Sequence, residues 1–147
     1  MFSRMTQQVE MPNANDLQRV EQHRDWTLGH LQLDQQDLYA AYDQKLILLA
    51  TILANKWIEP SETWKLQSLG ITLGDALVQR HGFEWVTVED EYGRDPAIRL
   101  VGTSILVFPL TMISKRIENG ETVDVYAMID GVQRTVADIT AQPPSSI

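Results

Sequence analysis

The chain contains no cysteine among its 147 residues. This absence excludes disulfide bonds, thiolate ligands for zinc and a cysteine nucleophile. The chain also lacks a run of about 20 apolar residues, the length that a membrane-spanning helix needs, and its first residues lack the apolar segment of a secretory signal. We therefore expect no association with membranes and a location in the cytoplasm.

Basic residues are scarce as well. Twelve lysines and arginines stand against twenty aspartates and glutamates, which gives a formal charge of -8. Nucleic-acid binding depends on a surplus of positive charge, so we expect no nucleic-acid partner. The acidic residues are densest between residues 81 and 103, where five acidic side chains accompany two basic ones. This charge favours a protein partner with a basic surface, and a second copy of the chain is the other partner considered.

The length and composition fit a single folded domain. Residues 1–13 are polar and rich in glutamine, and residues 141–147 are rich in proline and serine. Both ends are predicted to be mobile tails that flank one domain over residues 14–140.

Helical spacing of apolar residues dominates the first half of the chain. It predicts helices over residues 16–29, 34–57 and 61–81. The second of these is apolar nearly all round from Leu46 to Ala54, so we expect it to lie in the middle of the core. Pro60 disfavours helical geometry in the residue before it and marks the end of this helix.

Two glycines interrupt the apolar pattern of the third predicted helix. Gly70 and Gly74 each cost about 1 kcal/mol relative to alanine inside a helix, so a close approach of another backbone is expected to offset that cost. The alternative is that one helix ends at Gly70 and Thr72 caps a new one. We favour a single helix that ends near His81.

After Gly82 the apolar residues alternate, which is typical of β-strands. Short turns separate three predicted strands, and connections this short join antiparallel neighbours. The three strands span residues 83–90, 97–101 and 105–108.

Pro109 suits the first position of the helix that follows the strands, and a last helix is predicted over residues 123–140. The predicted fold class is therefore α+β. It has a helical N-terminal half, a three-stranded antiparallel meander packed against the 34–57 helix, and C-terminal helices.

Residues from about 60 to 125 resemble a family of small uncharacterised bacterial proteins, a domain of unknown function. The resemblance lies in the motifs EWVTVEDEYGRDPA, at residues 84–97, and FPLTMISKR, at residues 108–116. It implies a scaffold and brings no activity. The order of these elements is also similar to small bacterial proteins that act as immunity partners of toxins, which implies a binding role.

One short stretch concentrates charged side chains, and it supplies the candidate binding residues Glu89, Asp90, Glu91, Arg94 and Asp95. Carboxylates on one loop can hold Mg²⁺ or Ca²⁺, share a proton, or bind a basic partner. The structural alternative is a hairpin turn in which Arg94 pairs with Asp90 or Asp95. In a further variant the guanidinium stacks on Trp85 or Tyr92 and locks the loop. We favour the structural role for Arg94.

The remaining candidate residues give weaker indications of a chemical role. His23 and His30 are expected to be solvated surface side chains, and no catalytic residue, metal ligand or cofactor is assigned. Trp57 and Trp64 flank Pro60 at a helix corner, which makes this corner the first candidate for an exposed apolar patch.

Two functions of different classes follow from these features. The preferred one is a small acidic, non-enzymatic interaction domain whose 89–95 turn engages a basic protein surface, for example as an immunity-type inhibitor of a bacterial toxin. The alternative is a metal-assisted hydrolase that uses the acidic loop 89–95 with His81 or Arg94.

Overall fold

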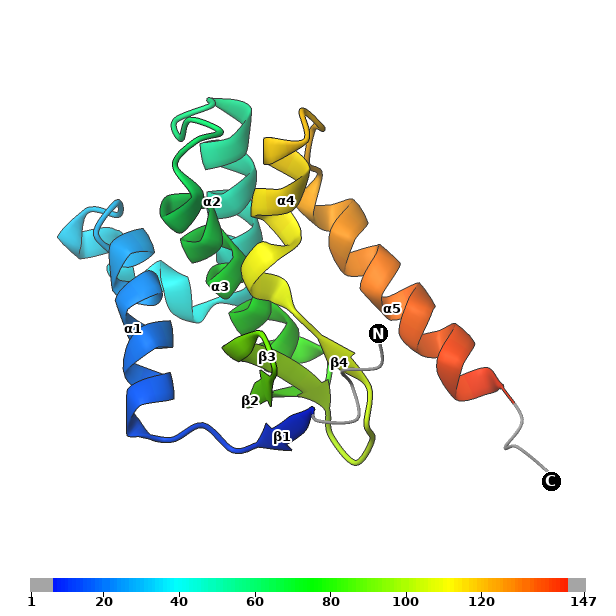
Figure 1. Cartoon of the computed structure of the whole chain (residues 1–147). Helices are drawn as coiled ribbons and strands as arrows, with labels where there is room; N and C mark the ends of the chain where they lie inside the picture. The colour runs from blue at the N-terminus through cyan, green and yellow to red at the C-terminus, as the bar shows by residue number, and fades with distance from the viewer. Residues whose placement is uncertain (1–6, 143–147) are drawn as a thin grey trace, which may run out of the picture.

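The computed structural model describes residues 7–142. Helices make up most of this part of the chain, and four strands form one antiparallel sheet at the lower end of the molecule in Figure 1. The predicted α+β class is confirmed. The elements in chain order are β1 (Gln8–Glu10), α1 (Ala14–Leu28), the 3-10 helix η2 (Leu33–Ala40), α2 (Tyr42–Ala54), α3 (Thr63–Arg80), β2 (Phe83–Asp90), β3 (Gly93–Leu100), β4 (Leu106–Val107), the 3-10 helix η3 (Pro109–Thr111), α4 (Met112–Glu118) and α5 (Val125–Ala141).

The sheet has the strand order β1-β2-β3-β4, with four strands rather than the three predicted. The additional strand, β1, pairs Val9 with Val88. It is only three residues long and exposed, too short for an alternating pattern to reveal it. β1 lies within the segment that the composition predicts as a tail, while residues 1–6 and 143–147 fall outside the described residues. The mobility of the two ends therefore stays a prediction.

The hairpin between β2 and β3 is tighter than the sequence suggested. Asp90 pairs with Gly93, so only Glu91 and Tyr92 form the turn. Gly93 has a φ of 131°, a backbone conformation that favours glycine, as expected at this position. The return strand begins at residue 93 and not at 97. Arg94 and Asp95 consequently belong to a strand and not to a loop.

The centre of the molecule is α3, which contacts α1, α2, η3, α4 and β2. Its apolar stripe is fully buried at Leu69, Leu73 and Leu77, and the helix is continuous through Gly70, as favoured above. The prediction that the sheet packs on a 34–57 helix is wrong, because β2 contacts α3. α3, the third helix predicted from the sequence, therefore occupies the central position that we expected for the 34–57 helix.

The predicted 34–57 helix is in fact two elements. Ala41 is extended, with a ψ of 134°, and it separates η2 from α2, which ends at Ala54. The break divides two buried tyrosines that bind different groups: Tyr39 reaches Asp75, and Tyr42 reaches His81. Periodicity alone could not detect the break, since the apolar spacing continues across it.

Gly70 and Gly74 permit the close approach that the sequence predicted. A Cβ atom at Gly70 would lie 2.3 Å from the carbonyl oxygen of Pro109, and one at Gly74 would lie 2.6 Å from the ring of Trp85. Real Cβ contacts are never this short. The two glycines thus bring η3 and β2 directly onto the central helix.

The last helix is only partly packed on the body. Its cap, Asp124, accepts hydrogen bonds from the backbone N–H groups of Tyr126 and Ala127. Val125 and Ile129 are buried in the first half, and the second half extends away from the other helices (Figure 1). No helix within residues 7–142 is both long and apolar enough to cross a membrane.

Candidate functional site

Arg94, the basic residue of the predicted charged cluster, joins three elements. Its guanidinium donates two hydrogen bonds to the carboxylate of Asp16 in α1, from Nε at 2.9 Å and from Nη2 at 2.6 Å. It also forms ion pairs with Glu10 in β1 and, at 3.1 Å, with Glu89 in β2. The guanidinium therefore fixes the start of α1 and the edge strand to the β2–β3 hairpin.

The other candidate residues of the cluster are spread over the hairpin. Asp95 forms an ion pair with Arg19 at 3.2 Å, and the carboxylate of Asp90 accepts a hydrogen bond from the backbone N–H of Tyr92. Glu91 is exposed in the turn. The predicted pairing of Arg94 with Asp90 or Asp95 is wrong.

The predicted stacking of Arg94 on an aromatic ring is also wrong. Within residues 7–142 the cation–π contacts join Lys45 with Tyr39 and Arg80 with Tyr42. A structural role for Arg94 is nevertheless supported, through ion pairs. These pairs hold the pKa of Asp16 at about 2, chiefly through the hydrogen bonds from Arg94.

In the hydrolase alternative, Arg94 does lie beside Glu89, but as an ion pair, and His81 lies far from the acidic turn. His81 precedes β2 and the acidic turn follows it, so the length of the strand, about 20 Å, separates them. His81 instead contacts Tyr42 at 2.8 Å and Gln133 at 2.9 Å. Among residues 7–142 no three histidine, aspartate or glutamate side chains are grouped closely enough to hold a metal ion. The geometry therefore gives the hydrolase alternative no support.

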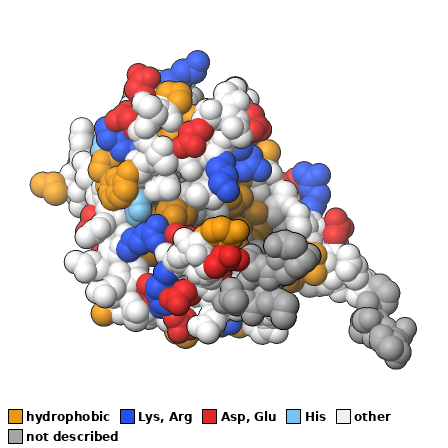
Figure 2. All heavy atoms as spheres, in the orientation of Figure 1, with side chains coloured by type: hydrophobic (Ala, Val, Ile, Leu, Met, Phe, Trp, Pro, Cys, Tyr) orange, Lys and Arg blue, Asp and Glu red, His pale blue; other side chains and the backbone are white. Residues whose placement is uncertain are grey.

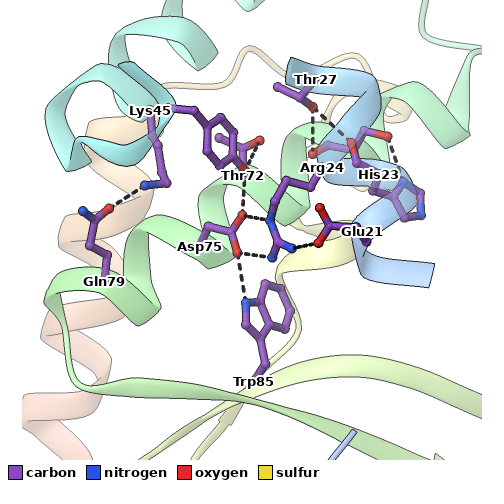
Figure 3. A network of polar contacts seen from close by, with 11 residues as sticks. Glu21, His23, Arg24, Thr27, Lys45, Thr72, Asp75, Gln79 and Trp85 are labelled. Carbon is purple, nitrogen blue, oxygen red and sulfur yellow. Dashed lines mark hydrogen bonds and ion pairs between the residues drawn. The ribbon is translucent and has the colours of Figure 1, made fainter. Parts of the chain in front are cut away.

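A different carboxylate, that of Asp75, is the centre of a network of hydrogen bonds (Figure 3). Arg24 in α1 binds it in a bidentate manner, with both nitrogen–oxygen distances at 2.7 Å. The Trp85 indole donates to the same carboxylate at 3.0 Å, and the Tyr39 hydroxyl donates at 2.6 Å. Asp75 thereby ties α1, η2 and β2 to the central helix. Each oxygen of the carboxylate accepts two hydrogen bonds, which indicates a structural role.

The surroundings of Asp75 change the chemistry of its partners. Burial raises the pKa of Tyr39 well above its usual range, and the Asp75 charge adds to this effect. The Arg24 pKa is raised by its hydrogen bonds to Asp75. Nearby, the buried Lys45 donates to Gln79, and burial lowers the pKa of this lysine. The sequence did not reveal this network, because Arg24 and Tyr39 lie 51 and 36 residues from Asp75 in the chain.

His23 is buried, contrary to the prediction of a solvated side chain. It is 2% exposed, its Nδ1 lies 2.8 Å from the Ser68 hydroxyl, and its ring stacks on Trp64 with 4.3 Å between the centroids. Burial lowers the pKa of His23 from 6.5 to about 4, and the charge of Arg19 contributes. The imidazole is therefore neutral in the folded protein at neutral pH.

The pKa of His23 predicts a loss of stability in weak acid. Below pH 6.5 the unfolded chain protonates His23, whereas the folded chain does so only near pH 4. The free energy of unfolding should therefore fall by roughly 3 kcal/mol over this window from this residue alone. We expect the His23→Gln variant to lack this component when urea unfolding is measured at pH 7 and pH 4. The exposed His30→Gln variant is the control and should keep the wild-type pH dependence; parallel profiles for wild type and His23→Gln would contradict the assignment.

An apolar pocket of about 730 Å³ lies at the end of the molecule opposite the sheet, where the α2–α3 and α4–α5 connections meet (Figure 1). We call it the corner pocket. Its apolar lining residues are Ala50, Ile52, Leu53, Ala54, Ile58, Pro60, Leu66, Ile117, Val123 and Val125. The sequence pointed to this region only through Trp57 and Trp64, which flank Pro60.

The rim of the corner pocket is acidic. Glu59, Glu121 and Asp124 line it together with one basic residue, Lys56. Acidic and hydrophobic side chains lie next to each other at this end of the space-filling view (Figure 2). Lys56 has a φ of 52°, and no other residue of the described part of the chain except glycine has a positive φ.

Exposed aromatic side chains accompany the pocket. Trp57, between the lining residues Lys56 and Ile58, is 63% exposed, and the lining residue Tyr126 is 51% exposed. Trp64, the other tryptophan beside Pro60, is 45% exposed, but it stacks on His23 and does not line the pocket. Apolar lining, exposed aromatic rings and a charged rim are the features that mark a protein-binding surface.

Comparisons with known proteins identify the fold and a family, without an activity. The family model of a domain of unknown function, DUF3806, matches residues 45–128, which confirms the resemblance seen in the motifs and includes every lining residue of the corner pocket. A crystal structure of a protein from Bacteroides thetaiotaomicron VPI-5482 is similar, with a TM-score of 0.70 and 15% sequence identity. The similarity covers 87% of this chain and 48% of that one, so the chain spans about half the length of its structural neighbour. No curated protein matches the sequence.

Proposed function

Because this chain belongs to the DUF3806 family, a domain of unknown function, we propose its role from its surface: it is a non-enzymatic domain that binds a basic segment of another protein at the corner pocket. The single observation that carries the proposal is an apolar pocket bordered by carboxylates and by the exposed ring of Tyr126. An immunity-type inhibitor of a bacterial toxin is a special case of this role, and nothing in the geometry selects it.

The charges of the corner pocket suit a basic partner better than those of the hairpin. At the hairpin, Glu89 and Asp95 already pair with Arg94 and Arg19. At the corner, neither Glu59 nor Glu121 forms an ion pair with any residue between 7 and 142. Carboxylates without an internal cation are the ones free to attract an external one.

The net charge of the chain supports the same partner. A formal charge of -8 attracts a basic protein over a distance of roughly 10 Å at 0.1 M salt, and it accelerates encounter. The apolar floor then supplies the contact area that charge alone does not. This combination predicts binding that weakens with salt but does not vanish.

A synthetic basic peptide tests the proposal. We expect an amphipathic peptide of leucine and lysine, about 18 residues long, to bind in calorimetry. Reversing both rim charges, in the variant Glu59→Lys with Glu121→Lys, should weaken binding at least about tenfold, because each like-charge contact costs on the order of 1 kcal/mol.

The matched control is Glu91→Lys with Asp138→Lys, which changes the net charge equally at exposed positions that do not line the pocket. This control should bind the peptide nearly as well as the wild type. Equal weakening in both double variants would show that only net charge matters, and absence of binding to the wild type would remove the proposal.

A further inference from the structure

We infer that the segment bound at the corner pocket is an α-helix, with its apolar side chains on the pocket floor and its basic side chains at the acidic rim. This inference rests on the proposed function and adds the conformation and chemistry of the partner. It follows from what the lining of the pocket can and cannot offer to a bound chain.

The floor of the pocket offers few hydrogen-bond partners to a backbone. Leu53, Ile58, Leu66, Ile117 and Val123 present aliphatic groups to it. An extended segment laid on this floor would turn unpaired N–H and C=O groups toward apolar atoms, and each such group costs about 1 to 3 kcal/mol. An α-helix satisfies these groups internally and presents only side chains.

Addition of a strand to the sheet is not available at this site. Every lining residue of the pocket belongs to α2, α3, α4, α5 or the connections between them, and none belongs to a strand. The sheet lies at the opposite end of the molecule (Figure 1). Of the common ways in which proteins bind peptides, the helix in an apolar groove is the one that this lining supports.

The size and charge of the pocket set the pattern of the helix. A volume of about 730 Å³ accommodates several side chains, as successive apolar residues three or four positions apart would supply. Lysine or arginine next to that stripe would face Glu59 and Glu121, and the exposed ring of Tyr126 would contact its side. The partner is therefore a basic amphipathic helix.

Two peptides of identical composition test the conformation. Both contain leucine and lysine in equal numbers; in one the leucines follow helical spacing, and in the other they alternate with lysine as in a strand. We expect the helical peptide to bind at least about tenfold more tightly in calorimetry, with an increase in helical circular dichroism on binding. Tyr126→Ala removes an exposed ring that lines the pocket and should weaken this binding severalfold, whereas the matched control Tyr92→Ala, at an exposed tyrosine of the hairpin, should not.

The outcomes separate this inference from the function on which it rests. Equal or tighter binding of the alternating peptide would contradict the helical conformation, while the proposal of a basic partner would stand. Failure of both peptides to bind would overturn both proposals. Preferred binding of the helical peptide that is unaffected by Tyr126→Ala would place the helix elsewhere and contradict the inference.

Discussion

Replacing Asp75 by alanine is expected to lower the free energy of unfolding by about 3 to 5 kcal/mol, the cost of breaking a largely buried ion pair and leaving Arg24 with only the exposed Glu21. The Arg24 guanidinium would lose both 2.7 Å contacts, and the Trp85 indole and the Tyr39 hydroxyl would lose their acceptor. The side chains of Arg24 and Asp75 are 23% and 12% exposed, so water cannot readily replace these contacts. Urea unfolding of the two proteins measures the difference.

The matched control for Asp75 is Asp130, whose carboxylate pairs with Arg134 at 2.6 Å on the surface of α5. Asp130→Ala should cost less than about 1 kcal/mol, because exposed pairs are screened by water and salt. Replacing Arg24 and Asp75 together by leucine should recover part of the loss, since no unpaired charge then remains. If Asp75→Ala lowers the free energy of unfolding no more than Asp130→Ala does, then Asp75 does not hold α1, η2 and β2 to α3.

Replacing Gly70 by alanine is expected to cost roughly 3 kcal/mol, although alanine is the better helix former. The added Cβ would meet the carbonyl oxygens of Pro109 and Leu110 at 2.3 and 2.8 Å. Both are backbone atoms, so no side-chain rotation relieves the overlap. Either η3 moves away from the central helix or α3 bends, and thermal or urea unfolding would detect both.

Gly131 is the matched control for Gly70. It too lies inside a helix, α5, but a Cβ there would have no neighbour within 4 Å. Gly131→Ala should therefore stabilise the protein by about 0.5 to 1 kcal/mol. Opposite signs for the two substitutions are predicted, and a stabilising Gly70→Ala would contradict the close packing of α3 on η3.

The sequence predicted those features that depend on neighbouring residues. Alternation located β2, helical spacing located α3, and the spacing of Gly70 and Gly74 predicted a close approach that the structure confirms. Each of these signals lies within one element. The identity of the neighbour, η3 or β2, depends on the whole fold and was not available.

Features that depend on distant residues were missed or misassigned. Arg94 was expected to pair within its own turn, but it donates two hydrogen bonds to Asp16, 78 residues away in the chain. His23 looked like a surface residue, because nothing local showed that Ser68 and Trp64 would enclose it. Asp75 was overlooked for the same reason.

The candidate site shifted from one end of the molecule to the other for a physical reason. Local charge density singled out residues 89–95. In the fold, however, Arg19 of α1 pairs with Asp95 and Arg94 pairs with Glu89, so two of the four carboxylates in this stretch already have a cationic partner. The corner pocket has fewer carboxylates, and they stand beside apolar surface. Trp57 and Trp64, which flank Pro60, were the sequence features that pointed toward it.

Amide chemical-shift mapping by NMR, with the helical leucine–lysine peptide added to the isotope-labelled protein, tests the central claim most directly. The corner pocket predicts that the largest shifts fall within residues 50–60 and 117–126, the two segments that supply most of its lining. Largest shifts at residues 89–95, with the corner unchanged, would contradict it and return the binding site to the acidic hairpin.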